Sequence, residues 1–112
     1  MARYRHLPGA ALAAALATPL TAAAALAAEP AEVRIDNFTF NPPSLTVAPG
    51  TVVTFSNADD IPHTVAASDR SWKSPVLDTG QSFSFTFAKP GSYAYFCSLH
   101  PRMVGVVVVA GP

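Results

Sequence analysis

The sequence predicts an all-β protein, an antiparallel Greek-key β-sandwich of seven to eight strands. Two observations lead to this fold class. Apolar and polar residues alternate with a period of two through most of the chain after residue 30, as in strands that bury one face. Proline and glycine turn signals separate these segments at short intervals, and no segment after residue 28 has a helical period. Short strands at this spacing are typical of a sandwich.

The first half of this region supplies four expected extended segments. Their apolar residues alternate or are β-branched and aromatic, and they lie at residues 33–36, 38–40, 45–47 and 51–56. Pro42-Pro43 ends the second segment and Pro49-Gly50 ends the third, because proline and glycine favour turns. The fourth segment ends at a polar stretch, residues 57–60.

The second half supplies four more, at residues 63–67, 81–87, 92–97 and 104–109. The segment at 81–87 is the clearest, because Phe83, Phe85 and Phe87 fall on one face and polar residues on the other. Residues 68–80 contain Trp72 and a proline without regular alternation, so we expect an irregular connection there.

The N-terminal segment has the pattern of a secretory signal peptide. Basic residues near the start precede an Ala/Leu-rich run over residues 10–28, and Ala25 and Ala27 form an A-x-A cleavage signal. A membrane anchor is the alternative, but the weak hydrophobicity of alanine and the internal Pro19 disfavour it. We therefore predict a signal peptide at residues 1–28, export to the periplasm, and no stable membrane insertion after cleavage.

The remaining residues, 29–112, are enough for one domain. They contain a single cysteine, so an internal disulfide is impossible, and metal ligation is one way to occupy this thiol. Five basic residues face seven acidic ones, which provides no basic field for nucleic acid and no polybasic patch for lipid. We expect a monomer.

One motif concentrates the chemistry of this domain. Cys97, His100 and Met103 form C-x2-H-x2-M between two expected strands, and His63 lies upstream behind a proline. After residue 28 these are the only Cys, His and Met residues. Taken singly, a cysteine or methionine is more often core filling than a ligand. Two imidazoles, a thiolate and a thioether together are the ligand set of an electron-transfer copper site.

The chain also resembles the cupredoxins, and within them the amicyanin and plastocyanin group. The segments that carry the resemblance are residues 50–57, 61–63 and 91–97 with the following ligand loop. The two-residue gap between His100 and Met103 is similar to that of amicyanins. The resemblance implies one type 1 copper ion held by His63, Cys97, His100 and Met103 as the axial ligand. It implies a soluble one-electron carrier that cycles between Cu(II) and Cu(I).

The resemblance also implies supporting roles near the ligands. The Asn57 side chain would bridge to the backbone of the ligand loop near Ser98, although a plain turn residue is the alternative for Asn57. The backbone N–H of Thr64 would point at the Cys97 sulfur. Thr64 itself is a departure, because amicyanin-like sequences often have asparagine there.

Redox partner proteins are expected to dock transiently at the His100 end, where Leu99 and Pro101 flank the imidazole. Three nearby charges would form the rim of this surface and affect the association rate: Asp59, Asp60 and Arg102.

Three other functions are alternatives to an electron carrier. A copper-handling protein for storage or delivery is the alternative, although the chain has no Met-rich or His-rich tract. An enzyme using Cys97 is not expected, because C-x-x-C is absent and no third group orients His100 as a base. A structural zinc site would gain little from a thioether.

Overall fold

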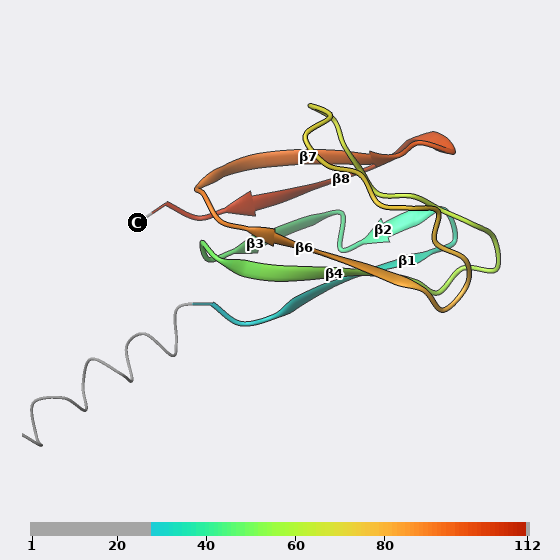
Figure 1. Cartoon of the computed structure of the whole chain (residues 1–112), viewed down its shortest axis with the longest axis horizontal. Coiled ribbons are helices and arrows are strands. Elements are labelled where there is room, and N and C mark those ends of the chain that lie inside the picture. Colours follow the sequence, from blue (N-terminus) through green and yellow to red (C-terminus); the bar gives the residue numbers. More distant parts are fainter. Residues whose placement is uncertain (1–27, 112) are drawn as a thin grey trace, which may run out of the picture.

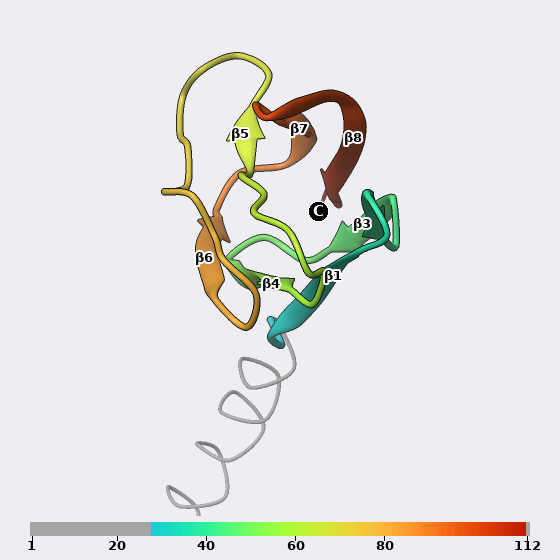
Figure 2. The ribbon, with the colours of Figure 1, turned by 90° about the vertical axis from the view of Figure 1, so that its right-hand side faces the viewer.

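The computed structural model describes residues 28–111, which form two β-sheets packed face to face (Figures 1 and 2). The predicted signal peptide, residues 1–28, lies almost wholly outside the described residues and stays a prediction. No helix long and apolar enough to span a membrane occurs in the part of the chain that the structure describes. The strands are β1 (Ala31–Asp36), β2 (Thr39–Asn41), β3 (Ser44–Val47), β4 (Thr51–Asn57), β5 (Ala66–Ala67), β6 (Ser82–Phe87), β7 (Gly91–Cys97) and β8 (His100–Val109).

The two sheets confirm the predicted sandwich and refine its topology. One sheet has the order β2-β1-β4-β6 and the other β3-β8-β7-β5. Both are mixed, because β1 pairs with β4 in parallel and β3 pairs with β8 in parallel. The expectation of a wholly antiparallel arrangement is therefore wrong for these two pairs. Alternation of apolar and polar residues reports which face a strand buries and carries no information about the direction of its neighbour.

The first hairpin places a phenylalanine at its turn. Asn37 and Phe38 have positive φ angles of 50° and 57°, as the two central residues of a type I′ turn do. Asp36 pairs with Thr39 on either side of the turn, and the Thr39 hydroxyl donates to the Asp36 carbonyl at 2.8 Å. The extended segment expected from residue 38 thus begins at Thr39, and the Phe38 ring is left half exposed at one end of the sandwich.

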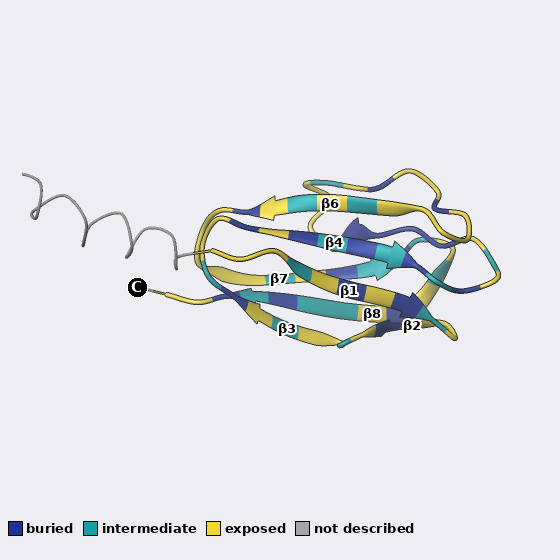
Figure 3. Cartoon of the chain, turned by 90° about the horizontal axis from the view of Figure 1, so that it is seen from below, coloured by how far each residue is buried: buried dark blue, intermediate teal, exposed yellow. Residues whose placement is uncertain are grey.

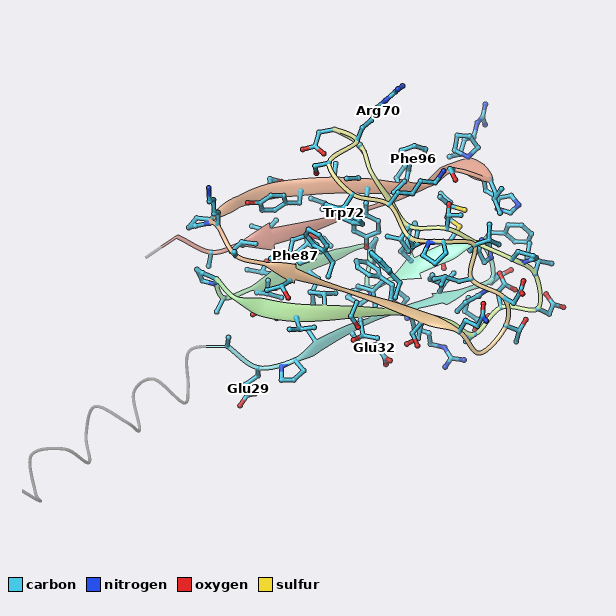
Figure 4. The ribbon with its side chains drawn as sticks, in the orientation of Figure 1. Glu29, Glu32, Arg70, Trp72, Phe87 and Phe96 are labelled. Atoms are coloured by element: carbon cyan, nitrogen blue, oxygen red, sulfur yellow. The ribbon has the colours of Figure 1, made fainter. Side chains whose placement is uncertain are left out.

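The core lies between the sheets, and its pattern follows the sequence. Buried residues of β4 alternate with exposed or intermediate ones, as Figure 3 shows. Phe83, Phe85 and Phe87 of β6 face inward, and the Trp72 ring stacks on that of Phe85 with centroids 4.7 Å apart. Figure 4 shows Trp72 near Phe87, within the space that the two sheets enclose. The irregular connection over residues 68–80 therefore supplies an aromatic side chain that closes one side of the core.

Tyr95 extends this core toward the end of β7. Its ring packs edge-on against Phe40 and Phe55, with centroids 4.8 and 5.2 Å apart. Gly105 is its partner on β8, and a Cβ at Gly105 would lie 2.4 Å from the tyrosine ring. Glycine at position 105 therefore leaves room for the ring of Tyr95. Tyr95 lies two residues before Cys97 in the chain.

The ligand motif is part of a hairpin and not of a free loop. Cys97 is the last residue of β7, His100 is the first of β8, and these two residues pair with each other. The register shifts between Phe96 and Cys97, which marks a bulge in β7. Met103 follows inside β8, which begins four residues earlier than the segment expected at 104–109. The hairpin thus holds three of the predicted ligands at one end of the sandwich (Figure 1).

Candidate metal centre

The structure brings three of the predicted ligands together. One ligand atom from each of His63, Cys97 and His100 lies within 4.8 Å of the others. The Cys97 Sγ is 3.8 Å from Nδ1 of His63 and 3.7 Å from Nδ1 of His100. His63 and Cys97 are fully buried, and His100 is half-buried. Two residues from the β7–β8 hairpin therefore meet a third from a separate segment before β5.

Met103 is the fourth predicted ligand, and its position is compatible with that role. It is buried, with 5% of its surface exposed, and belongs to the same core cluster as Cys97. It lies on β8 three residues beyond His100. Its assignment as an axial ligand stays a prediction.

The donor set fits a copper ion. Imidazole nitrogen and thiolate sulfur lie about 2.0–2.3 Å from a zinc ion that they bind, and we take this range as a guide for copper. Atoms that are 3.7–3.8 Å apart can therefore bond to one ion placed between them. A thiolate with two imidazoles in one plane and a weak fourth donor is typical of blue copper.

Hydrogen bonds to the Cys97 sulfur favour its deprotonated form, the thiolate. The backbone N–H of Thr64 donates to the Cys97 Sγ at 3.3 Å, as predicted, and the Thr64 hydroxyl donates to the same atom at 3.7 Å. Burial raises the pKa of the Cys97 thiol, but the hydrogen bonds from Thr64 and the contacts of the sulfur with the two histidine rings outweigh it. The result is a pKa of about 6. Because the thiolate is the form that binds a metal, these donors favour metal binding at neutral pH.

The bridge to the ligand hairpin comes from Thr64 and not from Asn57. The Thr64 Oγ1 accepts the backbone N–H of Ser98 at 2.7 Å and shares a second hydrogen bond with the Ser98 hydroxyl, also at 2.7 Å. The expectation that Asn57 makes this bridge is wrong. Asn57 ends β4, and its Nδ2 donates to the carbonyls of Ile61 and Leu77 at 3.0 and 2.8 Å. It therefore joins the two backbone segments on either side of His63.

The structure also overturns the expectation that Asp59 is a rim charge. Asp59 is buried, and its Oδ2 lies 2.9 Å from the His63 Nε2. The backbone N–H of Phe38, which also donates to Oδ2, and the His63 ring lower the pKa of Asp59 to about 2. Asp60 and Arg102 are exposed, as the rim role requires. Nothing in the sequence distinguishes Asp59 from the neighbouring Asp60.

Phe38 is a further residue near the centre that the sequence did not reveal. Its ring meets both histidine rings edge-on, with centroids 5.7 Å from His63 and 5.1 Å from His100. It is 49% exposed, and Leu99 is 48% exposed. The two side chains therefore give this end of the molecule apolar surface around the half-buried His100. Only the paired positive φ angles of the β1–β2 turn bring Phe38 here, and the sequence carries no clear signal for them.

Comparison with known proteins agrees with this geometry. A family model described as a cupredoxin-like domain matches residues 9–109. Amicyanin-alpha from Methylorubrum extorquens is 39% identical over 111 residues, which cover 89% of this chain and 93% of that protein. Amicyanin from Paracoccus versutus is 32% identical over 93 residues, which cover 79% of this chain and 70% of that protein.

Solved structures have the same fold. A purple cupredoxin from Nitrosopumilus maritimus superimposes with a TM-score of 0.69 at 34% identity, covering 71% of this chain and 99% of that chain. The crystal structure of Paracoccus versutus amicyanin gives 0.67 at 30% identity, covering 73% and 82%. A copper-containing nitrite reductase from Thermus scotoductus gives 0.70 at 32% identity, but the match covers 75% of this chain and only 23% of that enzyme.

Proposed function

This chain belongs to the cupredoxin family and is most like the amicyanins in it, and we propose that it is an exported blue-copper protein that carries single electrons between redox partners. The observation that carries the proposal is the convergence of His63, Cys97 and His100 on one buried point. Such a donor set suits a type 1 copper ion, which alternates between Cu(II) and Cu(I) when bound.

Each donor has a distinct part in this proposal. The Cys97 thiolate would bind the ion and give it the intense blue colour of a copper–thiolate bond. The Nδ1 atoms of His63 and His100, both facing the Cys97 sulfur, would supply the two imidazole donors. The Met103 thioether would be the weak fourth donor that tunes the potential.

The surrounding hydrogen bonds would hold the ligand side chains in the same positions in both redox states. Thr64 is bonded both to the Cys97 sulfur and to Ser98, so it holds the end of β7 against the segment that contains His63. Asn57 holds that segment on its other side. Ligands fixed in this way need little rearrangement when an electron arrives or leaves, which favours fast transfer.

Two features favour a carrier over the alternatives. Four protein donors around one ion leave no open position for a substrate, which argues against an enzyme. A storage or delivery protein must pass its metal to another protein, and that exchange requires accessible ligands. His63 and Cys97 are both 0% exposed.

Redox partners are proposed to dock at the end formed by Phe38, Leu99 and His100. An exposed apolar patch of this kind suits a transient interface that releases quickly. Asp60 and Arg102 would lie at its rim and affect the association rate. We propose a monomer that binds no nucleic acid. The predicted signal peptide supports a location in the periplasm.

Copper loading tests the proposal. Cu(II) is added to the purified protein without residues 1–28, and visible and EPR spectra are recorded. We expect a strong blue band and narrow copper hyperfine splitting. Cys97→Ser should abolish the blue colour, because no other thiolate is available, while weak colourless copper binding by the imidazoles can persist.

A wild-type protein that binds Cu(II) without a blue band would contradict the proposed site class. A Cys97→Ser variant that stays blue would contradict the assignment of this ligand.

A further inference from the structure

We propose that Asp59 is a positioning residue of the copper site, which fixes the ring of His63 and lowers the reduction potential of the metal. The part of this proposal that concerns the potential rests on the proposed function. The part that concerns the histidine ring does not, because it can be tested without metal.

The Asp59 carboxylate is held on all sides. Its Oδ2 accepts the backbone N–H of Phe38 at 3.0 Å and lies 2.9 Å from the His63 Nε2. Its Oδ1 accepts the backbone N–H of Asp60 at 2.9 Å. The Asp59 backbone is bonded as well, since its N–H donates to the Asn57 Oδ1 at 2.9 Å and its carbonyl accepts the Thr79 hydroxyl at 2.6 Å. The carboxylate therefore cannot turn away from His63 without breaking several hydrogen bonds.

This contact sets the orientation and tautomer of His63. A deprotonated carboxylate only accepts hydrogen bonds, so the Nε2 of His63 must carry the proton that it donates. The Nδ1 atom then has a free lone pair, and it is Nδ1 that faces the Cys97 sulfur. Asp59 thus presents the correct nitrogen to the metal before the metal binds.

The two imidazoles of the site therefore differ in their strength as metal donors. His63 is bonded to a buried anion. Within the described residues the structure shows no hydrogen bond between His100 and a carboxylate, and the His100 ring packs against Phe38. A carboxylate on the second ring nitrogen makes an imidazole a stronger donor. His63 is therefore the stronger donor of the pair, and His100 the more weakly held.

The negative charge of Asp59 also affects the relative stability of the two oxidation states of the metal. A negative charge near the site, poorly screened because it is buried, stabilises Cu(II) more than Cu(I). Both effects, the stronger donor and the negative charge, favour the oxidised state. Asp59→Asn removes the charge and keeps one side-chain oxygen, which can still accept from the His63 ring and the Phe38 N–H, while the amide nitrogen takes the place of Oδ1 and loses the hydrogen bond from the Asp60 N–H.

The first test compares the reduction potentials of Asp59→Asn and Asp60→Asn by voltammetry. The two variants lose the same charge at neighbouring positions, but Asp60 is exposed and reaches this hydrogen-bond network through its backbone N–H, which the substitution keeps. We expect Asp59→Asn to shift the equilibrium toward Cu(I) at least tenfold, which is about 59 mV for one electron. Asp60→Asn should shift it several-fold less. Equal shifts in the two variants, or none in Asp59→Asn, would overturn the proposal.

The second test uses wild-type apoprotein and holds even if Asp59→Asn fails to fold. Nitrogen-15 NMR of the histidine rings should show the His63 proton on Nε2, in slow exchange with solvent. A proton on Nδ1, or an average of both tautomers, would overturn the role of Asp59. Failure of the proposed function has a different signature, because copper would then give no blue band whatever the tautomer of His63.

Discussion

Single residues near the site take roles that depend on what surrounds them. Thr64 is the clearest example, because its backbone N–H and its hydroxyl both reach the Cys97 sulfur while its oxygen also accepts from Ser98. Its hydroxyl does the bridging that was expected of Asn57, and its small size lets one side chain contact both residues. Asp59 likewise changes from an expected surface charge to a buried partner of His63.

The role of Met103 can be tested with two variants for which we expect opposite shifts of the reduction potential. Met103→Gln replaces a soft sulfur by a harder oxygen, which stabilises Cu(II), so the potential should fall by a tenfold equilibrium shift or more, about 59 mV. Met103→Leu removes the donor and keeps the apolar volume, so the potential should rise. Voltammetry of the copper-loaded variants measures both.

Unchanged potentials in the two variants would make Met103 an ordinary core residue. A shift of the same sign in both would indicate a change of packing and not the loss of a ligand.

At the scale of elements, the β7–β8 hairpin determines how the site meets the solvent. Ser98 and Leu99 form its short turn between Cys97 and His100, so the chain reverses directly over the metal position. The β1–β2 turn approaches from the other sheet and adds Phe38 beside His100. Two turns from different sheets thus build one apolar surface, to which the β1–β2 turn contributes Phe38 and the β7–β8 turn Leu99.

Leu99→Lys tests whether this surface is the route of electron transfer. Electron self-exchange between Cu(I) and Cu(II) copies of the protein requires two such surfaces to meet. A lysine on each should slow it by roughly tenfold or more through repulsion and desolvation. NMR line broadening in mixtures of the two states measures the rate, and the visible spectrum should not change.

Val52→Lys is the matched control, because Val52 is also exposed, at 41%, but lies on β4 away from the ligand hairpin. Equal rates for Leu99→Lys and wild type would exclude this face as the route.

At the scale of the whole molecule, the domain folds around a core that does not require the metal. The buried side chains of β1, β4, β7 and β8 join both sheets in one cluster, and Trp72 closes its side. The metal ligands lie at one end of this cluster, where Cys97 and Met103 are also core residues. The apoprotein should therefore fold, with the site largely formed.

Copper should nevertheless stabilise this domain, because it binds only the native arrangement of ligands. At a free copper concentration of 100 times Kd, the gain in the free energy of unfolding is about 2.7 kcal/mol. For a domain of this size that raises Tm by roughly 10–20 °C. Calorimetry of the apoprotein and the copper-loaded protein measures the difference, and identical melting curves would contradict a preformed site.

The sequence by itself determined the fold class and the donor atoms. A period of two reveals strands because side chains alternate between faces, and the sole Cys and Met after residue 28 lie within seven residues, with a histidine between them. The spacing of this motif already indicated soft-metal chemistry. The type of each ligand is a property of single residues, so it can be read without knowing what lies across the sheet.

Only the tertiary structure decided the parallel pairs, the bridge made by Thr64, the contact of Phe38 with the histidine rings, and the burial of Asp59. Each depends on which segments meet across 20 or more residues, as Phe38 and Asp59 do over 21 positions and Thr64 and Cys97 over 33. Local alternation is the same for a strand with a parallel or an antiparallel neighbour. An aspartate in a polar turn likewise looks the same whether it faces solvent or a ligand histidine, because its environment is set by packing and not by its neighbours in sequence.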